Sequence, residues 1–158
     1  MKPKDQLGYI TNLDAHPFGG FSFFNHWGKY FGWYVDWRPA MNDMHPEYWT
    51  EASIPQEEPD LDNQTLWTSI TNAGLSIKLF SNQKRAIMIY AGYGIKNTKL
   101  YSGYNINNEY RYYENDNHLS DENYNVGLLF QSKRILSWQI GFDSSLSSGV
   151  NFGIGLTF

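Results

Sequence analysis

Few residues of this chain could carry covalent catalysis, because it has four histidines and no cysteine. His118 and Ser120 stand two positions apart, and a serine nucleophile needs a nearby base of this kind to attack an ester. Both residues occur in a polar, asparagine-rich stretch, where a histidine is more often simply solvated. We therefore predict no catalytic residue, with a lipid-ester hydrolase as the alternative.

Oxygen ligands for a hard cation gather at Asp60, Asp62 and Asn63. Ca²⁺ and Mg²⁺ prefer carboxylate and amide oxygens in proteins. The spacing lacks the glycine and the final glutamate of a complete calcium-binding loop, however, and a solvated acidic loop explains the same residues. We predict no metal site and no cofactor.

A third group of polar residues stands at alternate positions within otherwise apolar stretches. A spacing of two puts side chains on one face of a β-strand, so the role of this group depends on the strands that position it. The group consists of Asp36, Arg38, Lys78, Lys96, Gln139 and Asp143.

The strand pattern is clearest at the end of the chain, from Ile135 to Phe158. Apolar residues alternate there with small or polar ones on both sides of an SSLSSG turn. This period of two predicts a hairpin with one apolar, aromatic face and one polar face. In a soluble sandwich the apolar face would pack on a second sheet. In a membrane barrel it would contact lipid, and the polar face would line a lumen.

The same alternation predicts six more strands, which makes eight. In the fifth of them, Ile87, Ile89 and Ile95 share one face with Tyr93, while the residues between them face the other way. The faces of the second strand cannot be assigned, because nearly all of its residues are apolar or small. The predicted ranges are Leu7–Leu13, Pro17–His26, Phe31–Arg38, about Thr65–Phe80, about Ala86–Tyr101 and Asn123–Gln131.

The connections after even-numbered strands differ in length from those after odd-numbered strands. Those after the second, fourth and sixth strands are short, whereas Met41–Gln64 and Ser102–Glu122 are long. These two long connections hold 12 of the 16 acidic residues, and the short turns hold only basic ones. An outer-membrane barrel has an even strand number, with short turns at one end and long loops at the other. The pattern therefore favours a membrane barrel over a soluble β protein.

The last residues, NFGIGLTF, resemble the C-terminal assembly signal of bacterial outer-membrane barrels, through Asn151, Gly153, Leu156 and Phe158. From about Gly8 onward the chain resembles the small eight-stranded barrels such as OmpX and the membrane domain of OmpA. The order of its segments is most similar to that in small barrels of the Bacteroidota. Examples are PFGGFSFFNHWGKYFGWYVDWR and AGLSIKLFSNQKRAIMIYAGYG.

This resemblance implies an all-β fold: a single eight-stranded antiparallel transmembrane barrel over residues 1–158. It also implies a place in the outer membrane of a Gram-negative bacterium, with both termini periplasmic and the long loops extracellular. The signal peptide would already be removed, and the barrel assembly machinery would insert the chain. Lipid and lipopolysaccharide would surround it, and cations bridging its acidic loop to lipopolysaccharide phosphates are an alternative role for that loop. The family has no single activity, so the task is not implied.

In an eight-stranded barrel the side chains just fill the interior. Buried charges must pair, so we predict that Asp36, Arg38, Lys78, Gln139 and Asp143 form an internal network of ion pairs and hydrogen bonds. A narrow ion path is the alternative. Interfacial aromatic belts are predicted outside the barrel, at Trp33, Trp37, Trp67, Trp138 and Tyr124.

Partner contacts are predicted in the two long connections, since exposed aromatic side chains invite association. The leading hypothesis is a non-enzymatic accessory or structural subunit that binds a larger outer-membrane protein through these loops or its lipid-facing wall. A lipid-modifying enzyme and a narrow pore are the alternatives, and no basic patch supports nucleic-acid binding. The candidate contact residues are Trp49, Tyr104, Tyr110, Tyr112 and Tyr113.

Overall fold

The computed structural model describes residues 2–13, 19–27, 29–41, 61–106 and 109–158. Every regular element in these ranges is a β-strand, and none of the described residues forms a helix long and apolar enough to cross a membrane. The strands are β1 (Gln6–Asn12), β2 (Gly19–Trp27), β3 (Phe31–Met41), β4 (Leu61–Ser81), β5 (Arg85–Ile106), β6 (Glu109–Ser132), β7 (Leu136–Asp143) and β8 (Val150–Thr157).

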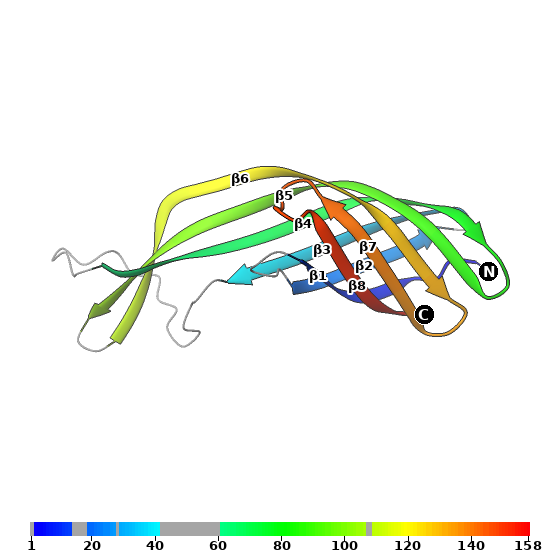
Figure 1. The fold of residues 1–158 in the computed structure, drawn as a ribbon, viewed down its shortest axis with the longest axis horizontal. Coiled ribbons are helices and arrows are strands. Elements are labelled where there is room, and N and C mark those ends of the chain that lie inside the picture. Colours follow the sequence, from blue (N-terminus) through cyan, green and yellow to red (C-terminus); the bar gives the residue numbers. More distant parts are fainter. Residues whose placement is uncertain (1, 14–18, 28, 42–60, 107–108) are drawn as a thin grey trace.

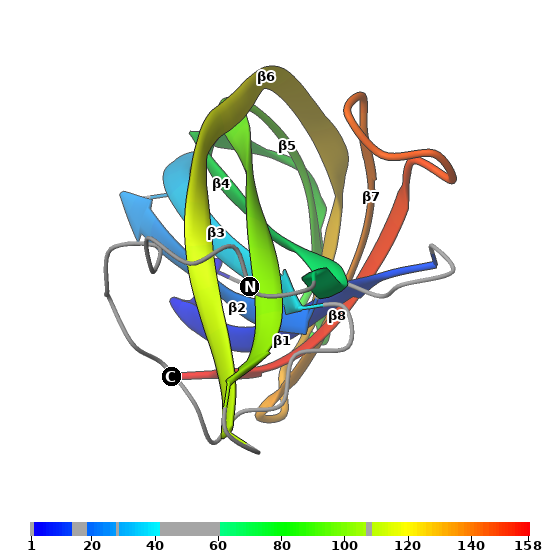
Figure 2. The ribbon, with the colours of Figure 1, turned by 90° about the vertical axis from the view of Figure 1, so that its left-hand side faces the viewer.

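These eight strands form a closed antiparallel barrel in which each strand pairs with its neighbours in the chain (Figure 2). The first and last strands close the ring, with Gly8 opposite Gly155 and Asn12 opposite Asn151. Closure gives both β1 and β8 a partner on each side, which leaves no edge along this part of the sheet. The predicted all-β, eight-stranded antiparallel barrel is confirmed.

Side chains alternate between the interior and the outer wall, as the period of two predicted. On β5, Met88 and Tyr90 are buried, whereas Ile89 and Tyr93 are exposed on the outside. The structure also settles the faces of β2, which the sequence left open. Phe21 is on the outer wall and Phe24 is fully buried, so an aromatic side chain occupies an interior position of that strand.

The strands differ greatly in length. β1, β7 and β8 have 7 or 8 residues, whereas β4, β5 and β6 have 21, 22 and 24. About 9–11 residues suffice to cross a bilayer in a tilted strand. The long strands therefore continue past one end of the barrel, as Figure 1 shows for β5 and β6.

The prediction of an irregular loop over Ser102–Glu122 is wrong. β5 and β6 stay paired from Arg85 opposite Ser132 as far as Ile106 opposite Glu109, with one register shift. Backbone hydrogen bonds hold this pairing, and they do not depend on an apolar face. The sequence predicts a loop there because polar residues stand at successive positions, which removes the alternation that marks a half-buried strand.

The two ends of the barrel differ. The termini and the short turns of β4–β5 and β6–β7 lie at one end, called here the termini end (Figure 1). The β5–β6 hairpin projects from the other, called the outer end. Of the predicted loop Met41–Gln64, the last four residues belong to β4, and residues 42–60, which include Trp49, lie outside the described part of the chain.

Candidate functional site

An arginine flanked by two carboxylates lies in the barrel interior. The Arg38 guanidinium donates through Nε to Asp36 at 2.9 Å, and through its two terminal nitrogens to both oxygens of Asp143 at 2.7 and 2.8 Å. All three residues are buried, and Arg38 is fully inaccessible to solvent. A paired fork of this kind is the strongest geometry available to an arginine and a carboxylate.

Four asparagines complete this network. Asn123 and Asn125 each donate to Asp143 at 2.8 Å, and Asn151 donates to its other oxygen at 2.5 Å. Asn72 donates to Asp36 at 3.1 Å and accepts from Asn123 at 2.7 Å. The three charged groups carry a net charge of −1. The amide donors therefore stabilise the carboxylate charge that the single guanidinium does not neutralise.

Five strands supply this network, because the inward positions of neighbouring strands meet at one level of the barrel. Asp36 and Arg38 come from β3, Asp143 from the end of β7, and the asparagines from β4, β6 and β8. The sequence pattern identified the three charged members. It did not identify the four asparagines as members. Their positions in the alternating pattern place them on the inward face, so they could have been predicted once a barrel was assumed.

The other predicted interior residues lie apart from the network. Lys78 is half-buried near the termini end, where its ammonium group is 4.6 Å from the centre of the Tyr30 ring. Its inclusion in the network is wrong: Lys78 is six residues along β4 from Asn72, about 20 Å at the strand rise. Gln139 is buried and accepts from Ser22 at 3.0 Å. Lys96 donates to the carbonyl of Ser145 at 3.2 Å, in the β7–β8 turn.

Apolar layers close the interior on both sides of the network. Toward the termini end, the rings of Phe24, Tyr34 and Tyr90 pack within 4.9 to 5.3 Å of one another, and Tyr34 donates to Asn125 at 2.8 Å. Toward the outer end, Ile70 packs against Leu146. In the described structure, these side chains pack the barrel interior on both sides of the charged layer.

The outer wall of the barrel carries a row of apolar side chains. Ile89, Leu128, Ile140 and Phe152 stand opposite one another across β5, β6, β7 and β8 and form one continuous row. Among the predicted belt residues, Trp37, Trp138 and Tyr124 are exposed on this wall, and Trp33 and Trp67 are half-buried. A wall with an apolar row and exposed aromatics suits a lipid environment.

The residues considered for catalysis or metal binding lie on β6, on β4 or outside the described residues. His118 and Ser120 are both exposed on the projecting part of β6. Asp60 lies outside the described residues, and Asp62 and Asn63 fall in the first residues of β4. Within the described ranges, no group of three or more histidine, aspartate or glutamate side chains could hold a metal ion.

The candidate contact residues Tyr104, Tyr110, Tyr112 and Tyr113 are brought together by the projecting hairpin. Tyr104 is on β5 opposite Arg111, and the other three are on the facing part of β6. The other side of β6 is an edge, since β7 pairs with it only from Asn125 to Gln131 and no other described strand continues the sheet. An edge of this kind is a template for an added strand.

The fold is that of the small eight-stranded outer-membrane barrels, as the sequence resemblance predicted. A solved structure of Ail, the attachment invasion locus protein of Yersinia pestis, is similar with a TM-score of 0.53 and 12% identity, covering 99% of this chain and 95% of that chain. A second structure of Ail, in complex with the heparin analogue sucrose octasulfate, is similar with a TM-score of 0.54 and 14% identity. It also covers 99% of this chain and 95% of that chain. No protein-family model and no curated protein sequence matches the chain.

Proposed function

We propose that this chain is a non-enzymatic outer-membrane protein that acts as an interaction module or accessory subunit of a larger outer-membrane assembly. The observation that carries this proposal is the β5–β6 hairpin, which continues the sheet past the barrel and presents an edge on β6. Its partner is a protein that adds to this edge or packs on the tyrosines beside it. Main-chain hydrogen bonds would supply the affinity, and side chains along the strand the specificity.

The outer-membrane location rests on three features together. The wall carries the apolar row from Ile89 to Phe152, aromatic residues are exposed on it, and every described strand belongs to one closed barrel. The terminal pattern of Asn151, Gly153, Leu156 and Phe158 supports insertion by the barrel assembly machinery. The termini end then faces the periplasm and the hairpin faces outward, among lipopolysaccharide.

The charge of the outer end narrows the class of partner. The connections Met41–Gln64 and Ser102–Glu122 carry 12 acidic residues and a single arginine. A sulfated saccharide such as the one held by Ail would be repelled here, so we do not transfer that ligand to this chain. A partner with a basic surface, or lipopolysaccharide phosphates bridged by divalent cations, matches this charge.

Two other functions receive less support. A narrow pore would need water or ions to pass Arg38, which is fully buried between an aromatic layer and Ile70. A lipid-modifying enzyme would need a nucleophile and a base placed at the lipid-facing wall. Bilayer conductance tests the first, and mass spectrometry of lipid A with and without the protein tests the second.

Truncating the hairpin in register is expected to abolish partner capture without harming the barrel. Lys96 stands opposite Asp121, so residues 97–120, which include most of the unpaired β6 edge, can be replaced by an Asn-Gly turn that joins these two strands. The measurement is cross-linking in intact cells followed by detergent extraction and identification of the linked protein. Heat-modifiable gel mobility shows whether the barrel is folded.

A second variant separates the backbone edge from the side chains. Replacing Tyr110, Tyr112 and Tyr113 by threonine keeps the hairpin length and its β propensity. Capture that survives this change but not the truncation assigns the contact to the strand edge. Undiminished capture by the truncated protein contradicts the proposal and moves the contact to the barrel wall around Trp37 and Trp138.

The orientation is tested by epitope tags on intact cells. Tags inserted near Glu58, in the connection between β3 and β4, and near Asp116, on the projecting part of β6, are expected to bind antibody from outside. Tags near Lys84 or Lys133, in the short turns, are expected to bind only after permeabilisation. The reverse pattern would show that the termini end faces outward.

A further inference from the structure

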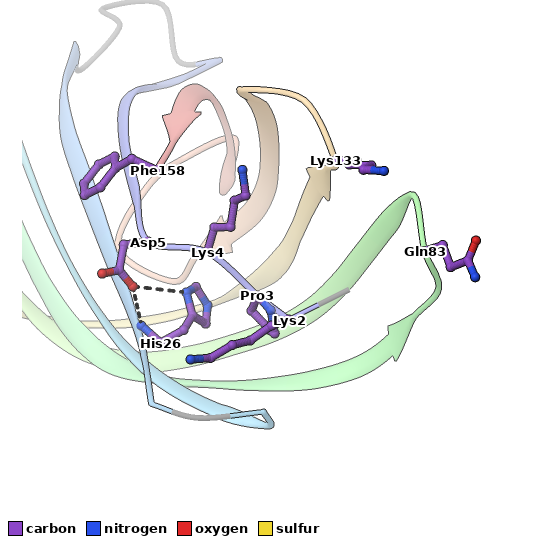
Figure 3. Close-up of a pocket in the computed structure, with 8 residues that line it drawn as sticks. All are labelled: Lys2, Pro3, Lys4, Asp5, His26, Gln83, Lys133 and Phe158. Carbon is purple, nitrogen blue, oxygen red and sulfur yellow. Dashed lines mark hydrogen bonds and ion pairs between the residues drawn. The ribbon is translucent and has the colours of Figure 1, made fainter.

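The two ends of the barrel offer different groups to a partner. At the termini end, the lysines around a cavity of about 580 Å³ point away from one another, and Asp5 accepts from the backbone of His26 (Figure 3). These side chains do not converge on one ligand. At the outer end, the run from Leu119 to Glu122 on β6 is exposed and has a described strand beside it on one side only. This run, called here the open edge, pairs with β5 without a register shift.

The backbone of the open edge directs hydrogen-bonding groups away from β5. Ser144, the residue after β7, donates its N–H to the Tyr124 carbonyl at 3.0 Å, and its hydroxyl accepts from the Tyr124 N–H at 2.9 Å. Tyr124 therefore bonds toward the β7 side. Since every second residue of an antiparallel strand bonds toward the same side, Glu122 and Ser120 direct their N–H and C=O groups there too. No described strand pairs with these two residues on that side.

Two side chains of the open edge are available to an added strand on the face that continues the barrel interior. Asp121 is exposed and makes no ion pair among the described residues, and the Lys96 ammonium opposite it donates instead to the Ser145 carbonyl at 3.2 Å. Leu119 is a large apolar side chain that is 66% exposed. Directly opposed side chains of antiparallel strands contact each other, so a cation facing Asp121 and an apolar group facing Leu119 would complement both.

The direction of β6 restricts the occupant of the open edge. β6 runs from the outer end toward the termini end, so an antiparallel partner strand runs outward, as β7 does (Figure 1). A second copy of this chain in the same membrane would present its own β6 in the parallel direction. The segment Ser102–Glu122 carries five acidic residues and one arginine, and like charges on facing strands are destabilising. Direction and charge therefore both favour a different protein as the partner.

We propose that the open edge binds an extended, outward-running segment of another outer-membrane protein, with a basic residue followed two positions later by an apolar one. The basic side chain faces Asp121 and the apolar side chain faces Leu119. Main-chain hydrogen bonds to Ser120 and Glu122 supply the affinity, and the two facing side chains select the segment. Ser144 sets the limit of this pairing, because it already bonds to the next outward-directed residue of β6. This inference rests on the proposed function, since it names the partner segment of the same hairpin.

The test uses a short fluorescent peptide with Lys-Thr-Val at its centre, and fluorescence anisotropy follows its binding to the full chain in maltoside micelles. This peptide is expected to bind about fivefold more tightly than the same peptide with Glu-Thr-Val, since it exchanges a repulsive for an attractive cross-strand pair. Asp121→Lys is expected to reverse this order. Asp121→Asn is the matched control, which keeps the size of the side chain and is expected to make the two peptides bind equally.

The backbone contact is tested separately. Ser120→Pro removes the outward N–H at a strand edge, where proline is tolerated, and is expected to weaken binding at least about fivefold, whereas Ser120→Thr keeps the N–H and is expected to change binding less than about twofold. A peptide N-methylated at the central threonine tests the same hydrogen bonds on the unaltered protein. It is also expected to bind at least about fivefold more weakly than the parent peptide.

Three results would overturn the proposal: no saturable binding of the Lys-Thr-Val peptide, an order of the two peptides that Asp121→Lys leaves unchanged, or full binding of the N-methylated peptide. If hairpin truncation still abolishes capture in cells, such a result rejects this segment while the proposed function stands. Self-association of the protein that Ser120→Pro abolishes would also overturn the proposal, because it would assign the open edge to a second copy of this chain.

Discussion

Replacing Arg38 by methionine is expected to lower the free energy of unfolding by about 3–5 kcal/mol, the usual cost of removing one partner from a buried ion pair. The change would leave the carboxylates of Asp36 and Asp143 buried together with no cation between them. Methionine keeps most of the volume, so the loss reports charge rather than a cavity. Urea unfolding of the protein refolded into lipid vesicles measures it.

The matched control is Arg134→Met in the exposed β6–β7 turn, which is expected to change the free energy of unfolding by less than about 0.5 kcal/mol. Adding Asp143→Asn to Arg38→Met is expected to restore part of the loss, because it removes one of the two unpaired charges. Equal stability of Arg38→Met and the original protein would mean that Asp36 and Asp143 do not need the guanidinium in the folded barrel, and it would contradict the stabilising role assigned to this ion pair.

Arginine at position 140 is expected to cost about 2–4 kcal/mol of folding free energy in lipid, the range for a cation near the middle of a membrane barrel wall. Ile140 is exposed on the outer wall, in the row that joins Leu128 to Phe152. The same change at Ile135, which directly precedes β7 at the termini end, is expected to cost about 0–1 kcal/mol, because an arginine there can reach the interface. Unfolding of each variant from vesicles gives the comparison.

A change at Gln139 tests whether the loss of folding free energy depends on the face of β7 that a side chain occupies. Its side chain points inward and accepts from Ser22, so Gln139→Leu is expected to cost about 1 kcal/mol through the lost hydrogen bond. A severe effect of Gln139→Leu combined with no effect of Ile140→Arg would mean that water, and not lipid, covers the Ile140 face of β7. The membrane location would then be contradicted.

The sequence by itself determined the strands that cross the barrel and the faces of most of them. An apolar wall facing outward requires alternation, and alternation can be read from one chain, as it was for Ile87 to Lys96 and for the closing hairpin. The interior position of Asp36, Arg38 and Asp143 was predicted from the same alternation, because they stand at the inward positions of their strands. The interior position of Phe24 was not predicted, since aromatic residues on both faces of β2 hide the period of two.

Only the tertiary structure decided what these residues contact. Asp143 is 105 positions from Arg38 in the chain, and the two meet because closing the ring brings β3 and β7 to one interior. The length of the β5–β6 hairpin was likewise invisible, since its pairing rests on backbone hydrogen bonds that leave no mark in the side-chain pattern. The hydrogen bonds between Lys4 and Gln131 likewise join segments that lie 127 positions apart in the chain. Alternation is a local property of one strand, whereas register, closure and the fit of distant segments depend on the whole barrel.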